Sequence, residues 1–364
     1  MATQQLKNHS KNDTSVLSIF DFKEKFNIHL EAFLKTKLYS IGKNTKDESI
    51  NKIIQQSALI AHAGGKRVRP YMAYLGYSLN GGKENPKLFD ALVGIELFHA
   101  FALIHDDIID ESDERHSQAT VHKFAENILP LAKQKKHFGT SQALLTGDLI
   151  FAWSQEALLG NTKVSSLDAV RTIYHKMIEE VVIGQMIDVV ITNAEKVSKF
   201  DIEEKNRLKT ARYTFVNPLK IGAGMETDLN KYDEFFEEFG LAIGTGYQVQ
   251  DDLLDICGNS KDIGKDSMKD LEKGQHTYFT QYIFDEGNDE QKRLLKSMFG
   301  TLLNEDQKIE AKKLFESSGA ISAGKNIITE KLELAKKSLK KYNIPEYHSD
   351  AFSTILSIIE KRTL

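Results

Sequence analysis

Apolar residues recur at three- and four-residue spacing along most of this 364-residue chain, and this feature limits the possible fold most strongly. The spacing places them on one side of an α-helix. It predicts long helices over residues 88–110, 141–160, 169–191 and 235–256. The chain has only five prolines, against about 18 expected at the average usage of about 5%. Strand-like alternation never extends beyond a few residues, so we expect an all-α fold.

Composition and chain layout are those of a soluble globular protein, with 41% hydrophobic and 27% charged residues. We expect residues 1–15 to form a disordered tail and residues 16–364 a single all-α domain. The tail lacks the apolar core of a secretory signal, and we expect no membrane span because no run reaches 18 apolar residues. One cysteine, Cys257, excludes an intrachain disulfide framework and fits a cytoplasmic location. The net charge of −4 argues against nucleic-acid binding.

Two segments 145 residues apart each end an apolar helix with the same acidic pattern. They are LIHDDIID (103–110) and QVQDDLLD (248–255), and their aspartates are Asp106, Asp107, Asp110, Asp251, Asp252 and Asp255. Residues four apart share one helix face, so the first and last aspartates of each motif stack. A single acidic turn is usually a solvated helix face. Six carboxylates around one cavity would need cations, and Mg²⁺ typically bridges carboxylates to phosphates, so the pair predicts a site for an apolar chain with a phosphate-rich head.

Basic residues elsewhere are candidate ligands for that head. The segment AGGKRVRP (63–70) carries Lys66, Arg67 and Arg69 behind two glycines, which allow the backbone to approach an anion closely. Arginine can bind phosphate with two parallel hydrogen bonds. Taken alone, such a stretch is more often a solvated basic turn. The other polar candidates are Arg115, Lys209, Thr210 and Lys265.

As a set, GGKRVRP, DDIID, KT, GQMID, YQVQDDLLD and the loop GK…DL resemble the motifs of the trans-polyprenyl (isoprenyl) diphosphate synthases. The resemblance extends from about residue 25 to the end of the chain. It implies the isoprenoid synthase fold, with packed helices around a central cavity, and usually a homodimer. It also implies two substrates, isopentenyl diphosphate and an allylic diphosphate, which are joined into a longer all-trans prenyl diphosphate.

The resemblance implies a role for each candidate residue. Three Mg²⁺ ions would be held chiefly by Asp106, Asp110 and Asp251, with the neighbouring aspartates helping. The allylic diphosphate would be bound by Arg115, Lys209 and Lys265. The carbocation formed when diphosphate leaves would face Thr210, Gln248 and the backbone carbonyl of Lys209. The site for isopentenyl diphosphate would contain Lys66, Arg69 and His99, and Arg67 is a further candidate for substrate binding. Supporting contacts would come from Gln185 and Asp188 in GQMID.

The chain departs from the family's pattern after each acidic motif. The family usually continues the first motif with Arg-Arg-Gly-x-Pro-Thr, whereas this chain has RHSQAT, so His116 replaces the second arginine. A customary lysine after the second motif is Gln275. Losing one charge-assisted hydrogen bond weakens binding roughly 10- to 150-fold. Two alternatives to chain elongation therefore stay open: a terpene synthase-like lyase and a non-catalytic subunit of a heteromeric prenyl synthase.

Residues just before the first motif bear on product length. Phe101 lies five residues before Asp106, about 7.5 Å along the helix, so its ring is a candidate floor for the channel that holds the growing chain. The neighbouring Ala102 is small, and Phe98 is a second candidate stop one turn further. This arrangement resembles family members that make C20 products, with C15 as the next choice. The alternative is that Phe101 is an ordinary core residue.

Overall fold

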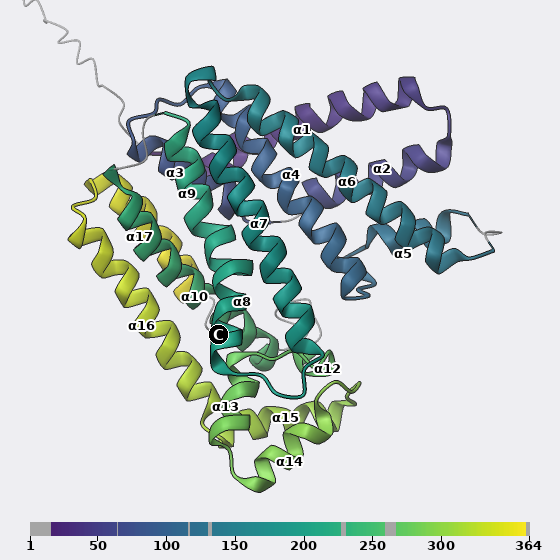
Figure 1. The fold of residues 1–364 in the computed structure, drawn as a ribbon, viewed down its shortest axis with the longest axis vertical. Coiled ribbons are helices and arrows are strands. Elements are labelled where there is room, and N and C mark those ends of the chain that lie inside the picture. Colours follow the sequence, from purple (N-terminus) through teal and green to yellow (C-terminus); the bar gives the residue numbers. More distant parts are fainter. Residues whose placement is uncertain are drawn as a thin grey trace, which may run out of the picture.

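A computed structural model of the chain describes residues 16–63, 65–115, 117–129, 133–226, 231–258 and 267–361. Helices make up 81% of these residues and strands only four residues, which confirms the all-α expectation (Figure 1). The expected tail (1–15), His116 and Lys265 lie outside the described residues.

The described helices fall into two groups along the chain. The first group is α1 (Ile19–Asn44), α2 (Glu48–His62), α3 (Val68–Leu79), α4 (Pro86–Ile109), α5 (Val121–Ile128), α6 (Lys135–Asn161), the 3₁₀ turn η1 (Val164–Ser166) and α7 (Leu167–Thr192). The second group is α8 (Lys199–Asn206), the π-helix η2 (Arg207–Val216), α9 (Asn217–Gly224), α10 (Asp233–Cys257), α12 (Lys269–Glu272), α13 (Tyr278–Glu286), α14 (Asp289–Met298), α15 (Glu305–Ser317), α16 (Ala320–Lys341) and α17 (Glu346–Glu360). A two-residue hairpin, β1 (Glu114–Arg115) with β2 (Gln118–Ala119), follows α4.

The helices predicted from apolar spacing are confirmed, and local sequence explains where several begin. The predicted ranges lie within α6, α7 and α10, while α4 ends at Ile109 with Asp110 as its C-cap. At the start of α4, the side chain of Asn85 accepts a hydrogen bond from the backbone N–H of Leu88, and Pro86 occupies the first turn. Helices α13, α14 and α15 each begin with a reciprocal capping box.

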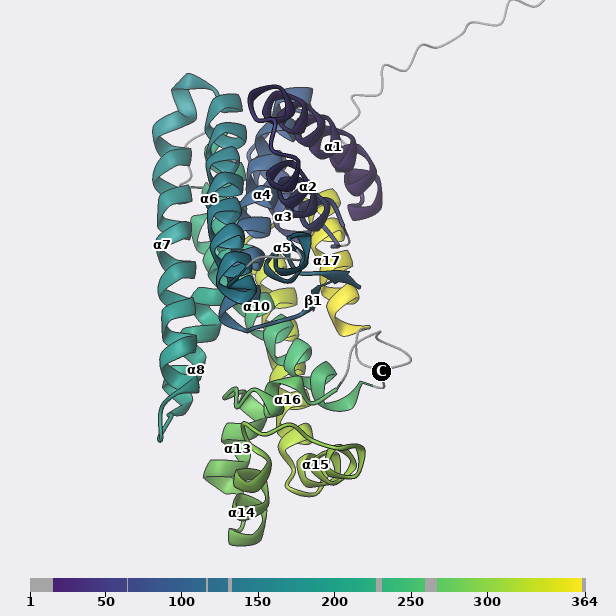
Figure 2. The ribbon, with the colours of Figure 1, turned by 90° about the vertical axis from the view of Figure 1, so that its right-hand side faces the viewer.

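The long helices pack side by side, and the short C-terminal ones gather at one end. Helix α4 packs along α6, and α10 packs along α16. Figures 1 and 2 agree that α13, α14 and α15 lie together beyond one end of the long helices. The buried apolar side chains form one cluster that includes residues from α1, α4, α10 and α17, so the helices share a hydrophobic core.

Helix α4 is apolar along almost its whole length. Among the described helices, it alone has the length and composition that a membrane-spanning helix would need. Two thirds (67%) of its most apolar 18-residue window is buried by neighbouring helices, as in the core helix of a globular protein. The apolar character of α4 is therefore explained by its packing between other helices.

Candidate active site

The first acidic motif forms the C-terminal end of α4. The side chains of Asp106 and Asp110 are 24% and 22% exposed, whereas that of Asp107 is buried. Burial raises the pKa of Asp107, although hydrogen bonding from Arg115 counteracts the rise. Arg115, placed by the β1–β2 hairpin, lies 2.6 Å from Asp107 Oδ1 through Nη2 and 3.6 Å from Asp106 Oδ2. Carboxylates are unfavourable at the negative end of a helix dipole, so this arginine offsets part of that cost.

The second motif ends α10, and its three carboxylates have different surroundings. Asp251 is exposed, whereas Asp252 is buried and accepts a 2.7 Å hydrogen bond from Gln248 Nε2. Burial raises the pKa of Asp252 to about 7. Asp255 accepts hydrogen bonds from the backbone N–H groups of Lys269 and Asp270, both at 3.1 Å. Asp251 is therefore the carboxylate of this motif that is best placed to meet a ligand.

Both motifs line one cavity of about 520 Å³. Its acidic lining residues are Asp106, Asp110, Asp188, Asp251, Asp252, Asp255 and Asp270. Within the described parts of the chain, no three such side chains are already close enough to form a metal-ligand cluster. Mg²⁺ usually takes one or two carboxylates and completes its shell with water and substrate phosphate. A cavity with carboxylates on facing helices therefore fits Mg²⁺ arriving with a phosphorylated substrate.

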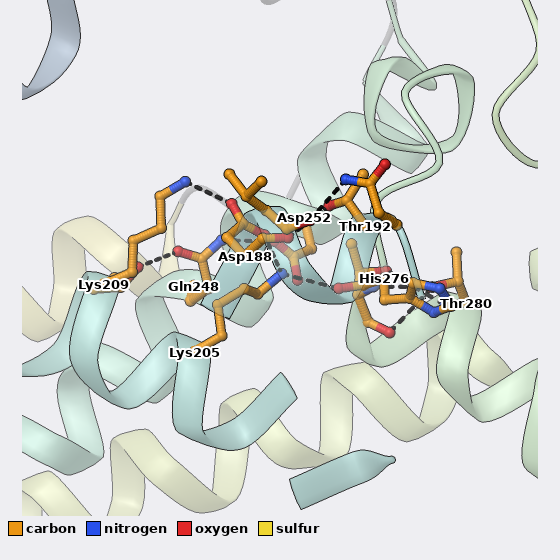
Figure 3. A network of polar contacts seen from close by, with 12 residues as sticks. Asp188, Thr192, Lys205, Lys209, Gln248, Asp252, His276 and Thr280 are labelled. Atoms are coloured by element: carbon orange, nitrogen blue, oxygen red, sulfur yellow. Dashed lines mark hydrogen bonds and ion pairs between the residues drawn. The ribbon is translucent and has the colours of Figure 1, made fainter. Parts of the chain in front are cut away.

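Lysines lie among these carboxylates. Lys209 Nζ lies 2.7 Å from Asp188 Oδ2 (Figure 3). It also lies 3.4 Å from Asp106 Oδ1. Burial alone would raise the pKa of Asp188, but the ammonium groups of Lys205 and Lys209 outweigh it and hold that pKa below its ordinary value. Lys273 Nζ lies 2.9 Å from Asp110 Oδ2. The cavity therefore has fixed positive charge beside both ends of the first motif.

Lys209 and Thr210 belong to η2, whose wider π-helical turn is common at functional sites. The hydroxyl of Thr210 donates a 2.6 Å hydrogen bond to Gln248 Oε1, which joins η2 to α10. Gly184 of GQMID lets α7 approach this segment closely, because a Cβ there would lie 2.6 Å from the backbone nitrogen of Lys209. The motif's glycine is thus explained by packing against the KT motif.

A second cavity, also of about 520 Å³, contains the predicted basic residues Lys66, Arg69 and His99. Arg69 Nη1 lies 3.1 Å from His99 Nε2, and its guanidinium lies over the ring of Tyr213, 4.4 Å from the centroid. His99 Nδ1 lies 3.2 Å from the Tyr213 hydroxyl. These contacts hold Arg69 and His99 in fixed positions at the cavity wall.

Arg67 differs from its basic neighbours, although it borders the same cavity. Its side chain is 2% exposed and pairs with the buried carboxylate of Glu96. Its other donors bond the backbone carbonyls of Ala61 and His62 and the side chain of Asn27. All three of its side-chain nitrogens are therefore engaged within the protein, in contacts that hold the loop.

A third cavity, of about 360 Å³, is mainly apolar. Its lining includes the predicted residues Phe98, Phe101, Ala102 and Gln185. The ring of Phe101 lies 5.5 Å from that of Phe98 and 4.9 Å from that of Phe151 on α6, centroid to centroid. Phe98 is fully buried, and it lines the cavity together with Phe101, while Phe151 packs against both rings.

Several site residues were not among the sequence candidates. They are Lys205, Lys273, Asp270 and Phe151. Both lysines occur in charged, polar stretches of the sequence that look solvent-exposed, Lys205 in α8 and Lys273 just after α12, and no signal distinguished them. Gln275 does line the acidic cavity, where Lys273, two residues earlier, supplies a positive charge.

Comparisons with known proteins identify the family. The family model described as polyprenyl synthetase matches residues 50–318. The chain is 30% identical to a short chain isoprenyl diphosphate synthase of Methanocaldococcus jannaschii over 71% of this chain and 75% of that protein. It is 31% identical to a geranylgeranyl pyrophosphate synthase of Geoglobus acetivorans over 76% of this chain and 81% of that protein. A solved geranylgeranyl pyrophosphate synthase of Corynebacterium glutamicum, complexed with isoprenyl diphosphate and magnesium, superposes with a TM-score of 0.88 at 25% identity, covering 95% of this chain and 100% of that one. The chain therefore belongs to the polyprenyl synthetase family of trans-prenyltransferases and has its all-α isoprenoid synthase fold.

Proposed function

We propose that this protein is a Mg²⁺-dependent synthase that condenses isopentenyl diphosphate with an allylic diphosphate to give a short all-trans prenyl diphosphate, C20 in preference to C15. One observation carries the proposal: Thr210 lines the acidic, the basic and the apolar cavity alike. A reaction that joins two diphosphates and lengthens an apolar chain needs three such spaces to meet at one point. The names of the relatives from Methanocaldococcus and Geoglobus support the same activity.

The acidic cavity would hold the diphosphate of the allylic substrate. Lys209 and Arg115 would bind its oxygens, since each already lies beside Asp106. Mg²⁺, three ions in this proposal, would be held by Asp106, Asp110 and Asp251, and when bound would stabilise negative charge on the leaving diphosphate. Lys273 would have to leave Asp110 to admit a cation.

The bond-forming step would take place beside Thr210. The bond between the allylic carbon and its diphosphate oxygen breaks, the double bond of isopentenyl diphosphate supplies electrons to that carbon, and a proton passes to the departing diphosphate. Because Thr210 donates its own proton to Gln248, its oxygen keeps lone pairs that can stabilise the cationic carbon. Lys66, Arg69 and His99 would hold isopentenyl diphosphate in the adjoining basic cavity.

Product length would be set by the aromatic end of the apolar cavity. Phe101 lies across it, supported by Phe98 and Phe151. A growing chain that reaches these rings cannot extend further without displacing a packed aromatic cluster. This arrangement supports a short product, and the relatives named geranylgeranyl synthases support C20.

The two alternatives have less support. A lyase would not need the built basic cavity in which Arg69 and His99 are held by Tyr213. A non-catalytic subunit would not need both acidic motifs to face one cavity, as they do here. Elongation uses all three cavities and is therefore the better account.

We propose that the protein forms a homodimer in which each chain is a single all-α domain. We also propose that the dimer is located in the cytoplasm. On α7, an exposed apolar stripe recurs at helical spacing and consists of Val182, Ile183, Met186, Val189 and Val190. Exposed apolar stripes of this kind mark contact surfaces. A Met186→Lys variant should shift the molar mass measured by light scattering from dimer to monomer, and a monomeric wild-type protein would refute the assembly.

The direct test is incubation with isopentenyl diphosphate, Mg²⁺ and allylic primers of five, ten or fifteen carbons, followed by chromatography of the products. We expect longer diphosphates, with C20 the main product, and loss of turnover by orders of magnitude in Asp106→Ala and Asp251→Ala with the helical content unchanged. Hydrocarbons or alcohols formed from a primer alone would instead identify a lyase. Absence of any product from the wild-type protein would support the non-catalytic subunit.

A further inference from the structure

Lys205 is a buried lysine on α8 that none of the proposed substrate contacts uses. Its residue exposure is 7%, it lines the acidic cavity, and its side chain points toward Asp188 in Figure 3. Burying an ammonium group is costly unless it is paired and hydrogen-bonded. Its ammonium lies 3.2 Å from Asp188 Oδ1 and donates a 2.9 Å hydrogen bond to the backbone carbonyl of His276.

Asp188 divides its two oxygens between two lysines. Oδ1 faces Lys205 at 3.2 Å, and Oδ2 faces Lys209 at 2.7 Å. Lys209 in turn lies 3.4 Å from Asp106 Oδ1 at the first acidic motif. Charges of alternating sign therefore run from α8 through α7 and η2 to the end of α4.

The hydrogen bond to the backbone carbonyl of His276 fixes Lys205, the first of these four charged residues. The ring of His276 is buried against Phe299, 4.8 Å between centroids, and the next residue, Thr277, N-caps α13. The accepting carbonyl is therefore held by packing on one side and by a helix start on the other. Lys205 cannot turn toward the open cavity without giving up this bond.

These contacts suggest what Lys205 does for Lys209. With Lys205 in place, Asp188 Oδ1 has a positive charge 3.2 Å away that offsets part of the negative charge of the carboxylate, so Lys209 is shared between Asp188 and Asp106 at the cavity. Without Lys205, the whole negative charge of Asp188 would act on Lys209. The ammonium would then be drawn away from the position where it meets diphosphate.

We propose that Lys205 is a positioning residue that acts through Asp188 to aim Lys209 at the allylic diphosphate. The proposal rests on the proposed function, because it needs Lys209 to be a diphosphate ligand. It makes Lys205 specific to one substrate: the basic cavity for isopentenyl diphosphate includes neither Lys205 nor Asp188.

The test compares Lys205→Met with Lys199→Met, a control on the same helix whose side chain is 65% exposed and pairs with Glu203 at 3.8 Å. Steady-state kinetics would give KM for each substrate, and calorimetry with inorganic pyrophosphate and Mg²⁺ would give a binding constant that does not depend on turnover. We expect Lys205→Met to raise KM for the allylic diphosphate and Kd for pyrophosphate on the order of tenfold to a hundredfold. KM for isopentenyl diphosphate should not change, Lys205→Arg should restore part of the loss, and Lys199→Met should match the wild type.

A double-variant cycle tests the route through Asp188. In the Asp188→Asn background, adding Lys205→Met should leave pyrophosphate binding unchanged. Comparing the double variant with Asp188→Asn still tests the route through Asp188 if Lys205→Met alone does not fold. The double variant removes both members of the buried pair, so it leaves neither charge buried without its partner. A further loss in the double variant, an equal rise in KM for both substrates, or a Lys205→Met protein that matches Lys199→Met would overturn the proposal. Failure of the proposed function would appear differently, as a wild-type protein that binds pyrophosphate but makes no product.

Discussion

Replacing Gly184 with alanine should slow the reaction and cost a modest amount of stability. Gly184 lies where α7 crosses η2, and an added Cβ would lie 2.6 Å from the backbone nitrogen of Lys209 and 3.0 Å from Leu208 Cβ. Ordinary contact begins at 3.4 Å, so the two backbones must separate by about 0.8 Å. The nearest atoms belong to the backbone of the residue that is proposed to bind diphosphate, so the shift moves Lys209 directly.

The size of each effect follows from this displacement. A misplacement of about 1 Å can cost on the order of 100-fold in rate, so we expect kcat to fall roughly 10- to 100-fold. Overpacking costs about 1–3 kcal/mol, but alanine in a helix regains up to about 1 kcal/mol over glycine. The free energy of unfolding should therefore fall by no more than about 2 kcal/mol. Steady-state kinetics and urea unfolding measure the two quantities.

Gly42→Ala is the matched control. Gly42 is also helical, in α1, but a Cβ there would meet nothing within 4 Å. The same substitution should leave kcat unchanged and stabilise the fold by up to about 1 kcal/mol. A Gly184→Ala enzyme with normal kcat would refute the view that close approach of α7 positions Lys209.

Three further predictions follow from single contacts. Phe101→Ala should lengthen the product, and an unchanged chain-length distribution on chromatography would show that the ring is not the floor. Arg67→Met leaves Glu96 buried without its partner and should lower the free energy of unfolding in urea by about 3–5 kcal/mol. Lys66→Met should change that free energy by less than about 0.5 kcal/mol and raise KM for isopentenyl diphosphate. Similar stability losses in the two variants would contradict a structural role for Arg67 and a substrate-binding role for Lys66. Because burial raises the pKa of Asp252 from 3.8 to about 7, the folded state binds its proton more tightly, so this group's contribution to stability is lost as pH rises from about 4 to about 7. Asp252→Asn should lose less stability over that range in urea unfolding, and parallel curves would exclude this cause.

Helix placement and the acidic motifs could be predicted because they depend on local sequence. Apolar spacing alone located α6, α7 and α10, and the motif spacing located the carboxylates that line the acidic cavity. A period of about 3.6 residues is a property of one segment and needs no knowledge of its neighbours. The same holds for Phe101, whose distance from Asp106 is fixed by the helix that carries both.

Residues whose role depends on a distant partner could not be sorted in this way. Lys66, Arg67 and Arg69 look alike in sequence, yet only Arg67 is fully buried, because Glu96 on α4 receives it and its backbone adopts a left-handed φ of 55°. Lys205 gave no signal because its partners come from α7 and the segment before α13. The roles of Arg67 and Lys205 therefore depend on tertiary packing rather than on local sequence preference.

The π-helical turn of η2 has a consequence for how this site can change over time. Its hydrogen bonds span one residue more than those of an α-helix. The wider turn carries one residue more than an α-helix joining the same two ends, so deleting one residue between Arg207 and Val216 would restore the tighter α-helical turn and leave α8 and α9 nearly in register. The side chains next to the deletion would change the face on which they lie, and Lys209 and Thr210, which line the cavities, belong to this segment. Substitutions in η2 can accumulate one at a time, whereas a single-residue deletion would remove the π-helical turn from the meeting point of the three cavities in one step.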